Sequence, residues 1–218
     1  MRKKLLFCLA LLPCAVFGAL VINPNLNPFF PKLADATADF SANQNPNGVW
    51  IYGWSEDLTG TVKLFPRSSN PNVNNGLEVG WDDPQNSAGF TPSVAVNAGG
   101  DFTDGNVTLS AGTLVLHPCG SDGHAYSHVI WTAPAKGVYF LNASFFAQQN
   151  GIDVDVHILV NQKTVFNELI NQNSTIRTFT HNFILARGDR LDFTVGPDGN
   201  YTLHPGNTGL QVVILRQN

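Results

Sequence analysis

After its first eighteen residues the sequence has no apolar run long enough to cross a bilayer, which takes about 20 residues in a helix. The opening stretch, MRKKLLFCLALLPCAVFG, joins a basic start to a short apolar run, a pattern typical of a secretory signal. We expect cleavage after Gly18, an extended lead-in at 19–36 and a single folded domain at 37–218. The predicted product is soluble and extracellular.

Cysteine and charge are both scarce. Of the three cysteines, Cys8 and Cys14 belong to the leader, so Cys119 stands alone and the exported chain cannot form an internal disulfide. Only 13% of the residues are charged, and loss of the leader leaves nine basic against sixteen acidic residues, a net charge of −7. This balance disfavours nucleic acid and anionic membranes as partners.

The sequence also lacks the short motifs that mark common catalytic sites. It contains no G-x-S-x-G turn, no H-E-x-x-H zinc motif, no phosphate-binding loop and no G-x-G-x-x-G fingerprint. A glycosidase needs two carboxylates at a defined separation, which the sequence alone does not establish. We therefore predict a protein that is not an enzyme, with a polysaccharide hydrolase as an open alternative.

No segment shows a sustained helical period. Gly, Pro, Asn and Asp instead separate short apolar runs, which predicts strands joined by turns. This pattern favours an all-β fold, a two-sheet antiparallel β-sandwich of the jelly-roll type. The tetrapeptide VNQK at 160–163 predicts a hairpin turn. Strands are expected at 48–54, 61–65, 93–97, 106–110, 113–117, 127–132, 137–147, 152–160, 163–169, 176–185, 189–195 and 209–215.

Five segments, in order, resemble the jelly-roll domain of exported bacterial proteins, many of the PEP-CTERM type. They are ADFSANQNPNGVWIYGW (38–54), LVLHP (114–118), VIWTAPAKGVYFLNASF (129–145), DVDVHILVNQKTVF (153–166) and LARGDRLDFTVGPDGNY (185–201). The resemblance implies a jelly roll and export, but no catalytic residues, because the family has no established activity. The chain departs from the family in lacking the Pro-Glu-Pro motif, terminal helix and basic tail.

Two of these stretches, WTAPAKGVYFLNASF and LARGDRLDF, are less specifically similar to two other groups of jelly rolls. One group is the carbohydrate-binding modules, and the other is the complement and tumour-necrosis-factor-like domains. A shared fold of this kind does not identify a function.

Three aromatic residues alternate in VWIYGW, so Trp50, Tyr52 and Trp54 fall on one face of the expected strand. Flat rings with a hydroxyl or N–H group suit stacking against a sugar, which makes these residues candidates for a ligand-binding platform. The same spacing is typical of a core face, and the neighbouring Val49 and Ile51 are apolar as well. Both interpretations stay open at the level of sequence.

The stretch GIDVDVHILV alternates in the same way. Its three valines and two isoleucines should be buried, while Asp153, Asp155 and His157 share the opposite face. Residues two apart on a strand lie about 7 Å apart, so these side chains could line a polar groove or, with help from neighbouring strands, bind Ca²⁺. The alternative is a solvated face without a ligand.

A third group lies in HPCGSDGHAYSH, which contains His117, Cys119, His124 and His128. Imidazole and thiolate ligands suit Zn²⁺ or copper, and the loop between the two strands could bring the four side chains together. Their spacing matches no established zinc motif. A structural loop with an incidental cysteine is the alternative.

These features favour a secreted, non-catalytic protein that binds an extracellular or envelope glycan or matrix. The alternative is a structural surface protein that self-associates into a trimer or array and takes no small ligand. The sequence establishes no cofactor, and Ca²⁺ and Zn²⁺ are the candidate ions.

Overall fold

The computed structural model describes residues 31–69, 78–83, 92–118, 125–171, 176–198 and 206–217. Within these residues it contains strands and no α-helix, which confirms the all-β class, and so no helix there could span a bilayer. The strands are β1 (Lys32–Asp35), β2 (Trp50–Ser55), β3 (Lys63–Leu64), β4 (Arg67–Ser69), β5 (Glu78–Asp82), β6 (Ser93–Asn97), β7 (Phe102–Asp104), β8 (Val107–Leu109), β9 (Leu114–His117), β10 (Tyr126–Thr132), β11 (Gly137–Ala147), β12 (Val154–Val160), β13 (Lys163–Ile170), β14 (Ile176–Leu185), β15 (Arg190–Gly196) and β16 (Thr208–Arg216).

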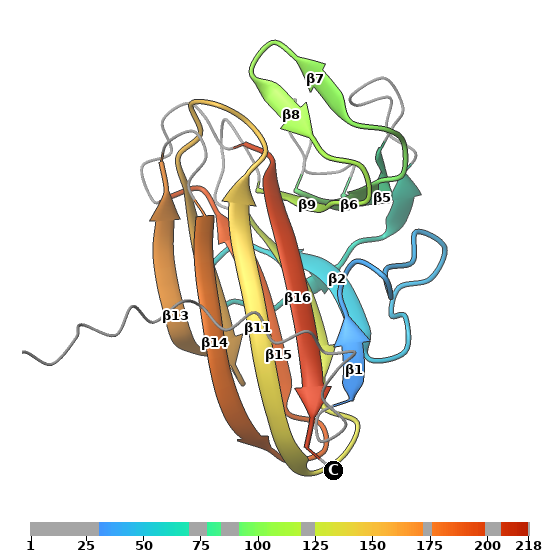
Figure 1. Cartoon of the computed structure of the whole chain (residues 1–218), viewed down its shortest axis with the longest axis vertical. Coiled ribbons are helices and arrows are strands. Elements are labelled where there is room, and N and C mark those ends of the chain that lie inside the picture. Colours follow the sequence, from blue (N-terminus) through green and yellow to red (C-terminus); the bar gives the residue numbers. More distant parts are fainter. Residues whose placement is uncertain are drawn as a thin grey trace, which may run out of the picture.

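The strands form two antiparallel sheets that share one core, and a small hairpin of β7 and β8 projects at one end (Figure 1). Sheet A has the order β14-β11-β16-β9-β6-β5-β4, with β1 paired to the end of β16. Sheet B has the order β13-β12-β15-β10-β2-β3. The predicted two-sheet antiparallel sandwich is confirmed.

The last eight strands follow the jelly-roll order. In sheet A, β9, β16, β11 and β14 are neighbours in that order, and in sheet B so are β10, β15, β12 and β13, so the chain changes sheet at almost every connection. The exception is the β12–β13 hairpin, whose turn residues Asn161 and Gln162 have φ of 49° and 69°. Positive φ at both positions is the type I′ geometry of two-residue hairpins. The hairpin predicted at VNQK is present.

Alternate residues of facing strands fill the space between the sheets. The largest fully buried side chains include Trp131 and Phe193 of sheet B and Tyr139 and Phe145 of sheet A. Each of the twelve expected strands overlaps an observed one. The segment predicted as a lead-in, 19–36, contains β1, which pairs with β16 at residues 213–215.

Candidate functional site

The aromatic side chains of β2 point into the core. Trp50, Tyr52 and Trp54 have exposed fractions of 1%, 0% and 8%, and they pair across the sheet with inward-facing residues of β10. They belong to the hydrophobic core that lies between sheet B and sheet A. This corrects the prediction of a sugar-stacking platform on these three residues and agrees with their interpretation as core.

The alternation predicted for β12 holds on its apolar side, where Ile152, Val154, Val156 and Ile158 are fully buried. The opposite side is not a solvated face. His157 is only 4% exposed, Asp155 is half-buried, and Asp153, which precedes the strand, is the one exposed member of the predicted group.

Asp155 is held by donors from three places in the chain. Its carboxylate accepts hydrogen bonds from His157 Nε2 at 2.7 Å, from Tyr126 Oη at 3.3 Å and from the backbone N–H of Asp198 at 3.0 Å. Burial alone would raise the pKa of Asp155, but the hydrogen bonds from His157 and Asp198 outweigh it and hold this pKa below its usual value. The described contacts make Asp155 a satisfied structural group.

Of the predicted metal ligands, Cys119 and His124 lie outside the described residues. His117 ends β9 in sheet A, whereas His128 lies on β10 in sheet B. Both ring nitrogens of His128 face protein groups, so His128 is not free to bind an ion. The described residues hold no cluster of three or more His, Cys, Asp or Glu side chains placed to bind a metal.

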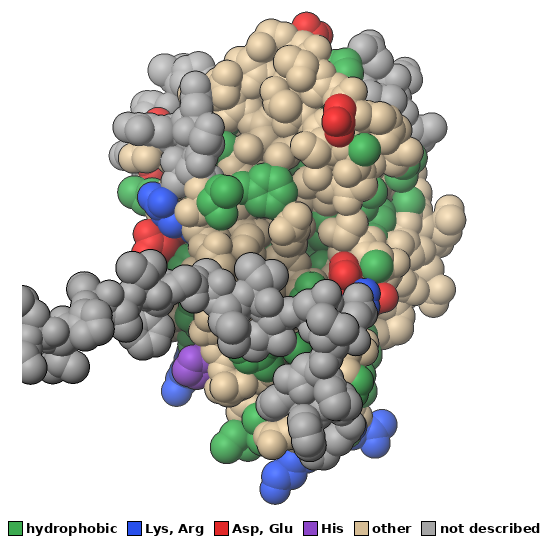
Figure 2. Space-filling view, viewed as in Figure 1, with side chains coloured by type: hydrophobic (Ala, Val, Ile, Leu, Met, Phe, Trp, Pro, Cys, Tyr) green, Lys and Arg blue, Asp and Glu red, His purple; other side chains and the backbone are tan. Residues whose placement is uncertain are grey.

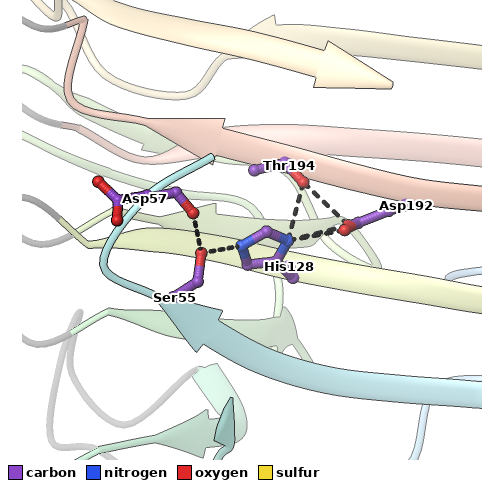
Figure 3. A network of polar contacts seen from close by, with 5 residues as sticks. All are labelled: Ser55, Asp57, His128, Asp192 and Thr194. Carbon is purple, nitrogen blue, oxygen red and sulfur yellow. Dashed lines mark hydrogen bonds and ion pairs between the residues drawn. The ribbon is translucent and has the colours of Figure 1, made fainter. Parts of the chain in front are cut away.

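His128 is the centre of a buried polar network that joins three neighbouring strands of sheet B (Figure 3). Its Nε2 lies 2.7 Å from Ser55 Oγ, at the end of β2, and its Nδ1 lies 3.0 Å from both carboxylate oxygens of Asp192 on β15. Thr194 Oγ1 lies 2.9 Å from the same Nδ1 and donates to Asp192 Oδ1 over 2.9 Å. Ser55, His128 and Thr194 are fully buried, and the Asp192 side chain remains 14% exposed.

Ser, His and Asp are also the side chains of a nucleophilic triad. The Ser55 hydroxyl has a single proton, and it donates this proton to the backbone carbonyl of Asp57 over 2.6 Å. Ser55 is fully buried, so its Oγ is closed to a substrate in this structure. The end of the polar network that reaches the surface is the Asp192 carboxylate.

Residues 56–62, the covering loop between β2 and β3, fold back over the outer face of sheet B. A Cβ built on Gly53 would lie 2.5 Å from the backbone oxygen of Lys63 and 2.7 Å from Val62 Cγ1, which is closer than real side chains approach. A glycine at 53 therefore permits this close crossing. The covering loop explains why outward-facing residues of sheet B, including the polar network, are buried.

The covering loop also walls a pocket of about 410 Å³, which we call the sheet B pocket. Ile130 and Leu159, both buried, form an apolar floor, and the rest of the lining, which we call the rim, is polar apart from Leu58, Val62 and two glycines. The volume falls within the range of small-molecule sites. The polar lining residues come from two connections and one strand: Thr59 and Thr61 of the covering loop, Asn161 and Gln162 of the β12–β13 turn, and Arg190 and Asp192 of β15.

The rim is fixed by backbone and side-chain hydrogen bonds. Asn161 Oδ1 accepts from the backbone N–H of Arg190 over 2.9 Å, and Asn161 Nδ2 donates to Asp189 Oδ1 over 3.1 Å. These bonds tie the β12–β13 turn to the start of β15. The amide group of Gln162 and the guanidinium group of Arg190 therefore belong to a turn and a strand that are joined by hydrogen bonds.

No protein-family model and no curated protein matches the chain. Among solved structures, a family 35 carbohydrate-binding module from Clostridium thermocellum is 15% identical with a TM-score of 0.32, covering 51% of this chain and 82% of the module. The structure of the M60 catalytic domain with the CBM51-1 and CBM51-2 domains from Clostridium perfringens ZmpB is 11% identical with a TM-score of 0.40. The match covers 64% of this chain and 18% of that one. At such values neither fold nor function can be transferred from these proteins.

Proposed function

We propose that the protein binds a polyhydroxylated ligand, the end or a branch of an extracellular glycan, in the sheet B pocket without hydrolysing it. The observation that supports this proposal is the placement of Asp192. His128 and Thr194 hold its carboxylate in one orientation, Asp192 is among the residues that line the pocket, and its side chain remains 14% exposed. An acceptor that is oriented before the ligand arrives loses little conformational entropy on binding.

The other lining residues match the two kinds of surface that a sugar presents. Its hydroxyl groups can accept from the Arg190 guanidinium and can exchange hydrogen bonds with the Gln162 amide and the Thr59 hydroxyl. Its C–H faces can pack on Ile130 and Leu159. Because no aromatic ring is among the described lining residues, hydrogen bonds would dominate recognition.

The same lining argues against glycoside hydrolysis. A glycosidase of the usual kind places two carboxyl groups on either side of the scissile bond. Among the described residues that line the pocket, Asp192 is the only acid. Its oxygens already accept from Thr194 and His128, so it is suited to hold a hydroxyl in place.

A glycan array followed by calorimetry on the best binder tests the proposal. Arg190→Ala should weaken binding about tenfold, the loss expected when one charged hydrogen bond is removed. Gln162→Gly should also weaken it, and glycine suits the positive φ at this turn, so the fold is preserved. Lys163→Ala, next in the chain and outside the pocket lining, is the matched control. Equal affinity for all four proteins would overturn the proposal.

The non-catalytic part has its own test. The protein should bind the glycan without releasing reducing sugar from it, because Ser55 is buried outside the pocket lining and Asp192 is the only acid among the described lining residues. Release of reducing sugar from the bound glycan, abolished by Ser55→Ala or Asp192→Asn, would instead identify a hydrolase.

A second candidate function, self-association, is favoured by the free edges of the two sheets. β13 and β14 end sheets B and A on the same side, where the rings of Phe166 and Phe179 meet at 5.3 Å. Neither strand pairs with a further strand among the described residues. Long unprotected edges are ready templates for pairing with another chain. Apolar side chains are exposed on both strands: Val165 (41%), Leu169 (42%), Ile176 (62%) and Ile184 (81%).

Sedimentation velocity separates the two candidates. If the edges mediate assembly, the protein should sediment as a dimer or larger species, and Ile184→Lys should shift it towards the monomer. Thr103→Lys, which adds the same charge at an exposed position of the β7–β8 hairpin, outside both sheets, controls for net charge. A monomer at every concentration reached would remove this candidate and leave the sheet B pocket unaffected.

A further inference from the structure

The outward-facing residues of β14 in sheet A are exposed, whereas the covering loop lies over the outer face of sheet B. The sheet A strands β14, β11 and β16 lie side by side (Figure 1), and alternate residues such as Leu141, Ala143 and Val212 point inward. The residues between them face outward and none is charged. They are Ile176, Thr178, Thr180, Asn182 and Ile184 of β14, Val138, Phe140, Asn142, Ser144 and Phe146 of β11, and Gln211 and Val213 of β16.

The strand register arranges the polar members in rows across the sheet. Ser144 lies between Thr178 and Gln211, and its hydroxyl is 3.1 Å from that of Thr178. In the next row, Asn142 pairs with Thr180. Rows on one face of a sheet repeat about every 7 Å along the strands, and neighbours in a row are about 4.8 Å apart. The result is an array of two adjacent rows of hydroxyl and amide groups, in which Val213 ends the second row.

An aromatic ring borders this array. A Cβ built on Gly209 would lie 2.4 Å from Cε2 and 2.5 Å from Cζ of Phe146, so the ring lies over the backbone of β16 where a side chain would otherwise stand. Phe146 remains partly exposed. A ring laid on a sheet in this way offers its other face to a partner, and aromatic rings contribute large contact area at low entropic cost.

The charge distribution restricts what this face can bind. A polyanion such as nucleic acid or an acidic polysaccharide would need Lys or Arg among the outward residues, and an anionic membrane would need the same. In the space-filling view, the side chains visible over the upper parts of β11 and β16 are tan or green, and red and blue side chains lie to either side of them (Figure 2). The complementary partner is uncharged.

We infer that the outer face of sheet A is a second binding surface, for a neutral polysaccharide chain lying across β14, β11 and β16. Sugar hydroxyls would bond with Asn142, Thr180 and Gln211, and a pyranose C–H face would pack on the Phe146 ring. This surface lies on sheet A and is separate from the sheet B pocket. It is suited to bind along the length of a polysaccharide chain, whereas the pocket is suited to the end or a branch of a glycan.

A depletion assay with insoluble cellulose and chitin, and with a polygalacturonate gel as the acidic counterpart, tests the inference. The protein should deplete onto at least one neutral polymer and not onto the acidic gel. Asn142→Ala combined with Thr180→Ala should reduce neutral-polymer affinity about fivefold to tenfold, because two hydrogen-bonding groups are lost. Phe146→Leu keeps the cover over Gly209 and removes the aromatic face, so it should weaken binding without unfolding the domain.

The controls separate this surface from the pocket and from self-association. Thr164→Ala, which removes an exposed hydroxyl from β13, should bind the polymer as the unchanged protein does. Gln162→Gly should also bind it unchanged. Loss of polymer binding in Gln162→Gly but not in the double variant, binding to the acidic gel alone, or no binding to any polymer would overturn the inference. Concentration-dependent dimerisation abolished by the double variant would assign the face to a second copy of the chain and would equally overturn it.

Discussion

At the residue scale, Asp155 shows how a strand residue that looks solvent-facing in the sequence can become structural. It accepts from His157, Tyr126 and the backbone of Asp198, whereas Asp153 is exposed. Asp155→Ala leaves three donors without their acceptor and should destabilise the protein by about 2 to 3 kcal/mol. Asp153→Ala, two residues away, should change stability by less than about 0.5 kcal/mol. Urea unfolding of the two variants measures the difference, and equal midpoints would restore the solvated-face interpretation.

His117 supplies a pH dependence at the same scale. Desolvation lowers the pKa of His117 to about 4, below the value of about 6.5 expected in an unfolded chain. Between these values the unfolded chain binds a proton that the folded chain does not, so stability should fall as the pH is lowered from about 6.5 to about 4. Urea midpoints measured across this range should fall less steeply in His117→Gln. An identical slope in the variant would show that other groups cause the loss.

At the scale of single elements, the covering loop depends on one glycine. In Gly53→Ala the new methyl group meets the backbone of Lys63, which cannot rotate away, so the loop must lift. We expect a loss of about 2 kcal/mol, typical of an overpacked site, together with weaker ligand binding in the sheet B pocket. Gly100→Ala is the matched control, since nothing lies within 4 Å of a Cβ there. Differential scanning calorimetry of both variants tests the contrast.

The turn between β12 and β13 gives a prediction of opposite sign. Gln162 has a φ of 69°, in the left-handed region where a side chain costs about 1 kcal/mol relative to glycine. Gln162→Gly should therefore raise stability by about 1 kcal/mol while it removes a rim amide. A higher thermal midpoint with lower glycan affinity is the expected result. A lower midpoint would mean that the amide makes stabilising contacts within the protein.

The elements that the sequence predicted well are the long alternating strands of the second half, such as β11 and β14. Their side chains repeat with period two because one face meets the core. The missed strands, β1, β4, β5 and β7, have three to five residues, too few for a period to stand out. The position of the covering loop over sheet B was also not predictable. Most of its residues are polar or glycine, and nothing in its composition indicates that it lies over the outer face of its own sheet.

The polar network could not be predicted for a related reason. Ser55, His128 and Asp192 belong to β2, β10 and β15, strands far apart in the chain that become neighbours only through the jelly-roll order. No local motif links them. Knowledge of the strand order would place His128 opposite Thr194, and Asp192 two residues before it. The sequence therefore identified His128 as a candidate residue, but as a metal ligand. Its ring nitrogens face Ser55 and Asp192 instead, so it is not free to bind an ion.

At the scale of the whole molecule, the strand formed last along the chain is central in its sheet. β16 pairs with β11 along its whole length and with β9 and β1 on its other side. A chain ending at Asn207 would leave these strands unpaired and open the core from which Leu210, Val212 and Ile214 come. We expect no cooperative unfolding transition from this truncated chain, as followed by tryptophan fluorescence. A sigmoidal transition would show that the remaining strands fold without β16.

The position of β16 has a consequence for when the protein can fold. Sheet A cannot be joined across its middle until residues 208–216 have been synthesised, because β16 lies between β11 and β9. A nascent chain that has not reached β16 can pair β11 with β14 and β9 with β6, but it lacks the strand that links these two halves. We therefore expect the sandwich to close only after translation has passed all of its strands, so that it does not grow strand by strand as the chain is made.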